Sequence, residues 1–241
     1  MENLSSAPIG KIWIASFDIG KNNFAFLIEE IDIILLNSIE NISSTLRYNI
    51  DSTVTVDFKN ILDKVYMTGK IILYENTNIT AGCEKNKYVE QRLFYNMQIL
   101  LDNYVSYFDK CSIIIIEKQM AFGKIINTMA LKLGQNCMSY FIFKYGMSKE
   151  IIEFPAYHKT QILGCSKILT HSKKGTIKYT SITKTNRKKW SIKEALNILT
   201  LREDIENLNH LSNSKKKDDL ADTLTQLQAY KYIVFVDKKC S

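Results

Sequence analysis

Four consecutive isoleucines, residues 113–116, lead directly into Glu117 and form the most strongly apolar run of the chain, CSIIIIEK. The run is shorter than a typical helix and β-branched residues favour extended backbone, so it predicts a buried strand. Residues 11–18, KIWIASFD, have the same character and also end at an acid, Asp18. The two runs predict a buried sheet in which two strands end at a carboxylate.

The remaining periodic segments predict further strands and helices. Across a glycine turn at Gly20, the first strand is expected to continue into a hairpin partner. The predicted strands are 11–18, 23–30, 69–77, 111–118 and 150–154, followed by a break at Pro155. The predicted helices are 56–67, 86–108, 125–145, 191–208 and 216–233. This order predicts an α/β fold with a mixed β-sheet flanked by α-helices.

The length and composition predict one globular domain over residues 1–241, because 46% hydrophobic residues can form a core and two prolines and nine glycines leave no evident linker. The N-terminus lacks a signal-peptide pattern, and no apolar run approaches the roughly 20 residues of a membrane helix. We therefore expect a soluble, intracellular protein with no membrane partner. Five scattered cysteines without a CxxC pair indicate reduced thiols, several of them in the core, rather than a zinc site or a disulfide framework.

The positive charge of the chain is concentrated in residues 154–193. This segment contains ten Lys or Arg residues and no Asp or Glu, whereas the whole chain has a net charge of +7. The rest of the chain therefore sums to −3. A basic block interleaved with Tyr157, Tyr179 and Trp190 is typical of a nucleic-acid-binding surface. The alternative is a solvated charge run without a partner.

A second group of acids lies in the late helical segment KKKDDLADTLTQLQAY. Asp219 and Asp222 are three residues apart and therefore share one helix face, where like charges repel unless a cation lies between them. Asp218 is one step around the helix. Together with Asp18 and Glu117, the pair could supply oxygen ligands for two Mg²⁺ ions. Each acid alone also has a simpler explanation, either a strand that reaches the surface or a helix N-terminal charge.

Four motifs in order, SFDIG, IIIIEKQ, LKLGQ (131–135) and DDLAD, resemble those of the RuvC-like Holliday junction resolvases of the ribonuclease H-like superfamily. The pattern is most similar to the poxvirus type. Each motif alone is weak, but the four in this order are specific. The resemblance implies a ribonuclease H-like mixed β-sheet flanked by α-helices, with insertions at about 30–80 and 164–190.

The resemblance also implies the site residues. Asp18, Glu117, Asp219 and Asp222 would be catalytic metal ligands for two Mg²⁺ ions, with Mn²⁺ as a substitute and no small-molecule cofactor. Lys159 would be a catalytic residue beside the scissile phosphate, where an ammonium stabilises charge on a phosphoryl oxygen or orients the attacking water. The alternatives for Lys159 are a simple phosphate contact or solvent exposure.

Further residues are expected to contact DNA or to shape the junction. The expected DNA contacts are Lys118, Lys159, Lys173, Lys174, Lys184, Arg187, Lys188 and Lys189. The aromatic residue that bacterial RuvC uses near the crossover corresponds to Met120 here, with Phe122 two residues further on. Packing is the alternative role for either side chain.

The implied activity is that of a crossover junction endodeoxyribonuclease, a Mg²⁺-dependent, structure-selective enzyme that resolves four-way (Holliday) and branched DNA by paired symmetric nicks. It would act in DNA recombination or in processing replicated viral DNA concatemers. Two symmetric cuts imply a C2 homodimer, for which the apolar helix around 129–143 is the candidate face, although a core helix would have the same pattern. A poxvirus-like source would place the protein in the host-cell cytoplasm.

Three other functions share parts of this pattern. A ribonuclease H or transposase-like nuclease would have the same fold, and a nuclease-derived protein could bind branched DNA without cutting it. Actin-like ATPases and sugar kinases also begin with a strand, a D-x-G turn and a hairpin. They need a second phosphate loop and a glycine-rich adenosine site, for which a chain with nine glycines offers no candidate.

Overall fold

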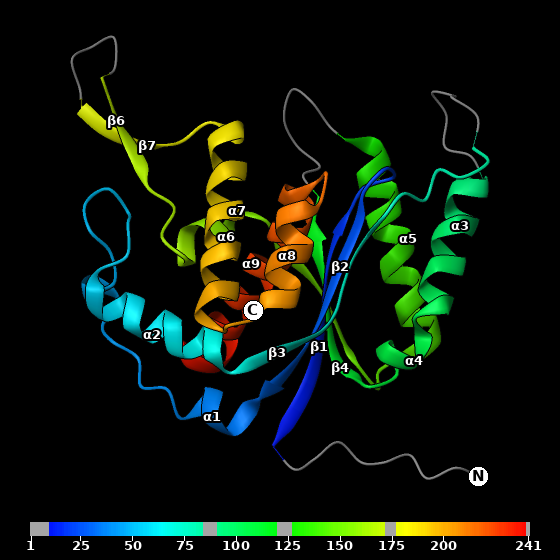
Figure 1. The fold of residues 1–241 in the computed structure, drawn as a ribbon, viewed down its shortest axis with the longest axis horizontal. Helices are drawn as coiled ribbons and strands as arrows, with labels where there is room; N and C mark the ends of the chain where they lie inside the picture. Colours follow the sequence, from blue (N-terminus) through cyan, green and yellow to red (C-terminus); the bar gives the residue numbers. More distant parts are fainter. Residues whose placement is uncertain (1–9, 84–90, 120–126, 172–176, 240–241) are drawn as a thin grey trace. The chain divides into compact units, whose positions relative to one another are not determined.

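The structure is a computed structural model that describes residues 10–83, 91–119, 127–171 and 177–239. The chain divides into two compact units. Figure 1 shows the chain as a ribbon with colours that follow the residue number. We call residues 1–34 with 69–155 the sheet unit, and residues 35–68 with 156–241 the helical unit. The expected single domain and its insertions stay a prediction.

The sheet unit contains one five-stranded mixed sheet in the order β3-β2-β1-β4-β5. β1 pairs antiparallel with β2, and β2 with β3, whereas β1 with β4 and β4 with β5 are parallel. The strands are β1 Lys11–Ile19, β2 Phe24–Asp32, β3 Gly69–Thr77, β4 Cys111–Lys118 and β5 Glu150–Pro155. The predicted α/β class and the mixed sheet are confirmed.

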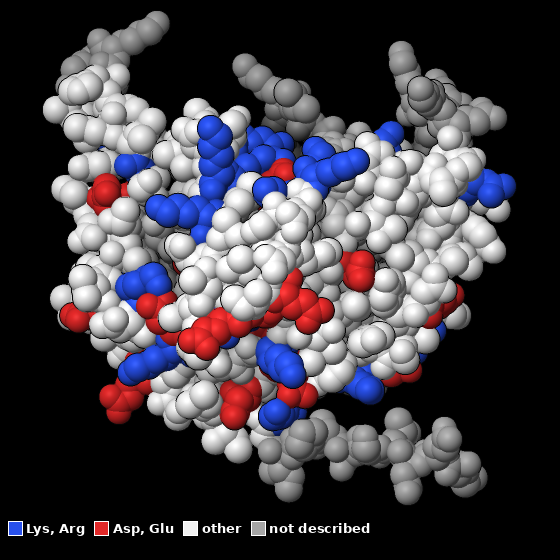
Figure 2. All heavy atoms as spheres, in the orientation of Figure 1, with Lys and Arg blue, Asp and Glu red and all other residues white. Residues whose placement is uncertain are grey.

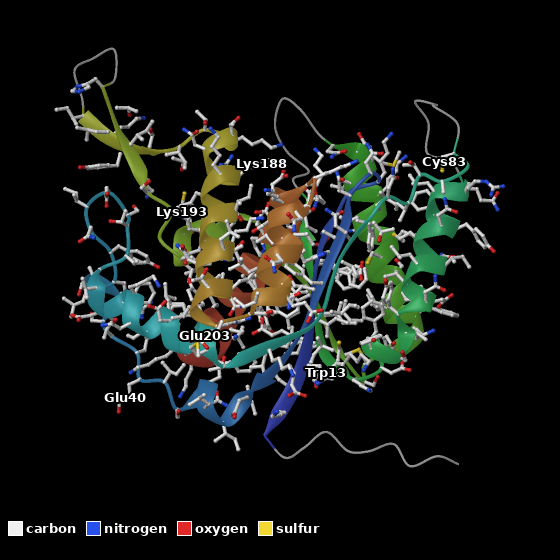
Figure 3. All side chains as sticks on the ribbon, in the orientation of Figure 1. Trp13, Glu40, Cys83, Lys188, Lys193 and Glu203 are labelled. Carbon is white, nitrogen blue, oxygen red and sulfur yellow. The ribbon has the colours of Figure 1, made fainter. Side chains whose placement is uncertain are left out.

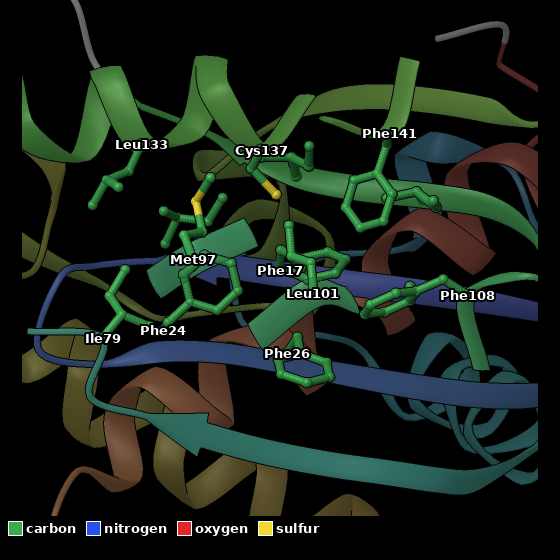
Figure 4. Packing of buried hydrophobic residues seen from close by; sticks show 14 of the residues in the cluster. Phe17, Phe24, Phe26, Ile79, Met97, Leu101, Phe108, Leu133, Cys137 and Phe141 are labelled. Carbon is green, nitrogen blue, oxygen red and sulfur yellow. The ribbon is translucent and has the colours of Figure 1, made fainter. Parts of the chain in front are cut away.

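Three helices of the sheet unit cover one face of this sheet (Figure 1): α3 Gln91–Asn103, α4 Val105–Phe108 and α5 Thr128–Tyr145. Between sheet and helices lies a core rich in aromatic rings (Figure 4), in which Phe17 stacks on Phe26 with ring centroids 5.4 Å apart and meets Phe141 at the same distance. Residues 86–108 were predicted as one helix, but the described part is interrupted at Tyr104, between α3 and α4.

The helical unit packs several helices around α9, Lys217–Lys231. The buried residues of α9 are Leu220, Ala221 and every residue from Thr223 to Lys231, so only the acidic start of this helix reaches the surface. The elements packed against it are α2 Val56–Met67, α6 Tyr157–Ile162, α7 Lys184–Leu201, α8 Ile205–Asn213 and η2 Tyr232–Val236. The unit also contains the short helix η1 Ser44–Leu46.

Two features of the helical unit differ from the prediction. Residues 191–208 were predicted as one helix, but α7 ends at Leu201 and α8 starts at Ile205, because Glu203 adopts a positive φ of 55° that a continuous helix does not allow. α7 also begins earlier than predicted, inside the basic segment, where the Thr183 side chain accepts a hydrogen bond from the Asn186 backbone N–H and caps the helix.

The basic segment also contains elements that the sequence did not predict. These are α6 and a separate two-stranded sheet, formed by β6 Lys167–His171 and β7 Ile177–Ser181. A short helix α1, Ile33–Asn37, follows β2 and was not predicted either. Elements of only five or six residues are too short to show a periodicity in the sequence.

The segment that follows α9 is tied to an early part of the helical unit. Arg47 and Asp237 form a buried ion pair at 2.6 Å, and Asn41 donates a second hydrogen bond to the same Asp237 oxygen at 2.9 Å. The Arg47 guanidinium also lies over the rings of Phe58 and Tyr232. These contacts fasten residues 41–47 to the segment after α9.

Two expectations from composition concern membrane helices and cysteines. No helix among the described residues is long and apolar enough to cross a membrane. Cys111, Cys137 and Cys165 are buried free thiols, and Cys83 is a half-buried one. Burial of several thiols is therefore confirmed.

Candidate active site

The two strand-end acids of the sheet unit lie on neighbouring strands. β1 and β4 are parallel, and Phe17 pairs with Ile116, so Asp18 and Glu117 follow at the same level. Adjacent strands lie about 4.8 Å apart, and successive side chains point to opposite faces. Since Phe17 and Ile116 belong to the core under the helices, both acids point to the other face of the sheet. The sheet register therefore brings Asp18 and Glu117 together.

A tight turn follows Asp18. Ile19 pairs with Phe24, which leaves residues 20–23 to reverse the chain. A Cβ on Gly20 would lie 3.1 Å from the carbonyl oxygen of Asn23, closer than side-chain carbons normally approach. The predicted glycine turn is confirmed, and a larger residue at position 20 would push the turn away from the strand end.

In the helical unit, both carboxylate oxygens of Asp222 have partners. The Ser191 hydroxyl donates to Oδ1 at 2.6 Å, and the Lys159 ammonium contacts Oδ2 at 2.9 Å. Ser191 is buried on α7, and Lys159 is only 7% exposed on α6. The alternative of a solvent-exposed Lys159 is therefore wrong. Two neighbouring helices hold Asp222 in one orientation.

Asp219 has a different environment on the same helix. Its Oδ2 is buried and receives no hydrogen bond within the described residues. Burial above all, together with the negative charges of Asp218 and Asp222, raises the pKa of Asp219 to about 6, against the opposing effect of Lys188. A buried carboxylate without a donor favours either a proton or a cation.

Asp218 is neutralised by a side chain from α7. Its carboxylate pairs with the Lys188 ammonium. Burial alone would raise the pKa of Asp218, but the hydrogen bond from Lys188 and the positive charge of that ammonium lower it. Figure 3 shows Lys188 on the part of α7 nearest its N-terminus. Lys188, one of the expected DNA contacts, is therefore already paired with a carboxylate. Asp218 pairs with Lys188, whereas Asp222 pairs with Lys159.

These acids have the chemistry of a Mg²⁺ site, because carboxylate oxygens are the ligands that this ion prefers. The donors are divided between the units, with Asp18 and Glu117 on one and Asp219 and Asp222 on the other. Within the described ranges, no group of three or more His, Cys, Asp or Glu side chains is arranged to hold a metal ion. The buried oxygen of Asp219, which receives no hydrogen bond from the described residues, is the observation that fits a cation.

Apart from Lys159 and Lys188, the expected DNA contacts and junction residues fall into three groups. Lys184, Arg187 and Lys189 are exposed near the start of α7, where blue side chains gather in Figure 2. Lys118 is exposed at the end of β4. Four residues lie outside the described residues, namely Lys173, Lys174, Met120 and Phe122.

Sequence reasoning missed Ser191 and the pairing of Lys188. Both lie on α7, three residues apart, and therefore share a face that meets α9. The three-residue spacing of Lys188 and Ser191 was the only feature of the sequence that could have indicated their contacts with the acids of α9. In the sheet unit, the LKLGQ motif places Gln135 on α5, where its amide donates to Glu153 on β5 at 2.9 Å.

Comparison with known proteins finds no matching family model. Among solved structures, the fowlpox virus resolvase in complex with Holliday junction DNA is 17% identical, over 92% of this chain and 99% of that chain, with a TM-score of 0.49. Thermus thermophilus RuvC with a Holliday junction substrate is 8% identical, over 92% and 94%, with a TM-score of 0.48. At these values the likeness does not by itself assign an activity.

Two curated viral proteins match along most of the chain. Uncharacterized protein 97L of Invertebrate iridescent virus 3 is 26% identical, over 90% of this chain and 98% of its own length. Uncharacterized protein 170L of Invertebrate iridescent virus 6 is 34% identical over 239 residues, which cover 94% of this chain and 92% of that protein. The chain therefore belongs to the same family as protein 170L of Invertebrate iridescent virus 6.

Proposed function

We propose that the chain is a Mg²⁺-dependent, structure-selective endonuclease that resolves four-way and other branched DNA by paired symmetric nicks. The observation that carries the proposal is the buried Oδ2 of Asp219, which receives no hydrogen bond within the described residues and has Asp222 one turn away. A cation would neutralise the Asp219 carboxylate, which lies beside the Asp222 carboxylate already paired with Lys159, and a metal-dependent nuclease holds its ions on such carboxylates.

Asp18, Glu117, Asp219 and Asp222 would hold the metal, as two Mg²⁺ ions or with Mn²⁺ in their place. When bound, Mg²⁺ supplies an activated water and stabilises the departing 3′ oxygen. The Lys159 ammonium would bind an oxygen of the scissile phosphate, and Ser191 would keep Asp222 oriented. The products would carry a 5′ phosphate and a 3′ hydroxyl.

The support for a branched DNA substrate comes from the ordered resolvase-like motifs. SFDIG ends β1, IIIIEKQ ends β4, LKLGQ lies on α5 and DDLAD opens α9. The exposed basic residues at the start of α7 would contact the phosphate backbone. Because the relatives are proteins of iridescent viruses, the substrate would arise in recombination or in replicated viral DNA.

A homodimer would supply the two symmetric cuts. The end of α5 and the turn after it expose the large apolar side chains of Ile142, Phe143 and Met147, of which the last two are almost fully exposed. An apolar patch of this kind favours a protein contact over free solvent. Ile142 and Phe143 belong to the segment 129–143 predicted as the dimer face, Met147 follows it, and a second copy of the chain is the proposed partner.

The test compares Asp219→Asn with Asp218→Asn, which makes the same chemical change one residue away. Each protein is incubated with a labelled four-way junction and with linear duplex, in Mg²⁺ and in EDTA. We expect wild type and Asp218→Asn to nick the junction symmetrically in Mg²⁺ only, and Asp219→Asn to bind it without nicking. Equal cutting of linear duplex, or activity in EDTA, would contradict the proposal.

The same assay separates the remaining alternatives. A ribonuclease H-like activity would cut an RNA–DNA hybrid in preference to the junction. A non-catalytic protein would bind the junction and leave it intact in Mg²⁺ and in Mn²⁺.

A further inference from the structure

The β6–β7 ribbon, residues 167–171 and 177–181, is separate from the main sheet. Its strands pair antiparallel from Lys167 with Ser181 to His171 with Ile177, and none of their ten residues is buried. Figure 1 shows the strands extending away from the helices of the helical unit. An isolated two-stranded ribbon is only marginally stable in water, so a partner that covers it would stabilise it.

The base of the ribbon is fixed to the helical unit. The Lys167 backbone N–H donates to the Asp51 carbonyl at 2.7 Å. Just before it, Gly164 has a φ of +79°, and a Cβ there would lie 2.5 Å from a Val54 side-chain carbon. The chain therefore leaves the unit at a defined point, while the strands beyond that point stay exposed.

The two faces of the ribbon differ in size and chemistry. Paired residues share a face, and successive residues alternate between the two faces. The larger face carries Lys167, Leu169, His171, Ile177, Tyr179 and Ser181, and the smaller face carries Ile168, Thr170, Lys178 and Thr180. Leu169 and Ile177 are 51% and 57% exposed. Large apolar side chains this exposed on a narrow ribbon indicate a surface that becomes covered.

The charge of the surrounding segment selects the partner. Lys167 and Lys178 are exposed on the ribbon, no acid occurs in residues 154–193, and the exposed basic residues of α7 follow directly. This charge complements a polyanion and repels a basic protein surface. The strands are about 17 Å long and about 4.8 Å apart, and a two-stranded ribbon of this size enters the major groove of duplex DNA.

We propose that the β6–β7 ribbon binds a groove of a duplex DNA arm, with the Leu169 face against the groove. Lys167, on the same face, would contact one phosphate, and the long side chain of Lys178 would reach from the opposite face past the edge of the ribbon to another. The ten strand residues include no Arg, Asn or Gln, the side chains whose planar ends read bases through paired hydrogen bonds. The ribbon therefore binds without strong sequence preference. This inference rests on the proposed function only in that the partner is DNA.

The test measures the dissociation constant for a fluorescent four-way junction in EDTA over a series of salt concentrations. For Lys167→Ala with Lys178→Ala, we expect the slope of log affinity against log salt to fall by about 1.8, at about 0.9 for each phosphate contact. The charge-matched control, Lys64→Ala with Lys70→Ala, removes two exposed lysines elsewhere and should leave the slope unchanged.

A second variant tests the apolar face. Leu169→Ser with Ile177→Ser should weaken binding roughly tenfold and leave the salt slope unchanged, because it removes apolar contact without removing charge. Unchanged affinity and slope in both ribbon variants would overturn the inference. So would unchanged DNA binding with a loss of dimer in sedimentation, which would assign the ribbon to a protein contact. Binding assays in EDTA do not depend on nicking, so either proposal can fail alone.

Discussion

The two acid pairs are held in place in different ways. In the sheet unit, the backbone register of β1 and β4 sets Asp18 beside Glu117. In the helical unit, side chains from other helices fix one acid of the pair, with Ser191 and Lys159 on Asp222. Positions set by the strand register depend on the whole sheet, so a single side-chain substitution does not move them. Positions set by side-chain contacts can be altered by substituting the single residue that supplies the hydroxyl or the ammonium.

The largest expected effect is on the packing that supports the strand register. Phe17, next to Asp18, is fully buried and contacts the rings of Phe26, Phe108 and Phe141. Phe17→Ala should lower the free energy of unfolding by about 3–5 kcal/mol, measured in urea, because it leaves a cavity in this core. A loss below about 1 kcal/mol would show that the register does not depend on this packing.

The next effect concerns the carboxylates. Glu117→Gln and Asp219→Asn should each slow junction nicking by more than about a hundredfold. A loss of this size exceeds the loss of activity expected when a residue that only supports a metal ligand is changed. The rates are measured under single-turnover conditions, with circular dichroism to confirm folding. If one pair proved dispensable, the two would not belong to one catalytic site.

A smaller effect is expected at Ser191. Ser191→Ala should weaken Mg²⁺ binding about tenfold, as measured by titration calorimetry, because Asp222 loses the donor that orients Oδ1. Ser191→Thr keeps the hydroxyl and should restore affinity. Thr225→Val removes a neighbouring hydroxyl that contacts Ser191 but not the Asp222 side chain, and it should have little effect.

The smallest effect is a pH dependence without metal. The folded pKa of Asp219 is raised to about 6 from an ordinary value of 3.8, so the folded state binds the proton more tightly than the unfolded state. Its contribution to stability is present below pH 3.8 and is lost as the pH rises through about 6. In EDTA, Asp219→Asn should therefore melt above wild type at about pH 8, and this difference should shrink towards about pH 4. A constant difference would contradict the raised pKa.

Much of the sheet unit could be predicted from the sequence. Continuous apolar strands such as β1 and β4 leave a clear signal, and β3 and α2 match the predicted residues 69–77 and 56–67. The partners of the helix acids could not be predicted, because Ser191 and Lys159 reach Asp222 only through the packing of α6 and α7 on α9. A single buried hydroxyl such as that of Ser191 leaves no periodic pattern in the sequence by which it could be found. The break between α7 and α8 could not be predicted either, since it depends on the backbone conformation of Glu203.

The ion pair between Arg47 and Asp237 has a consequence for synthesis of the chain. Its partners are 190 residues apart, and the second half of the sheet unit, residues 69–155, lies between them in the sequence. The sheet unit is complete once residue 155 has left the ribosome, whereas the helical unit cannot close until Asp237 has emerged. Residues 35–68 are therefore synthesised before the sheet unit is complete, but they can pack against the rest of the helical unit only after residues 156–237 have also been synthesised.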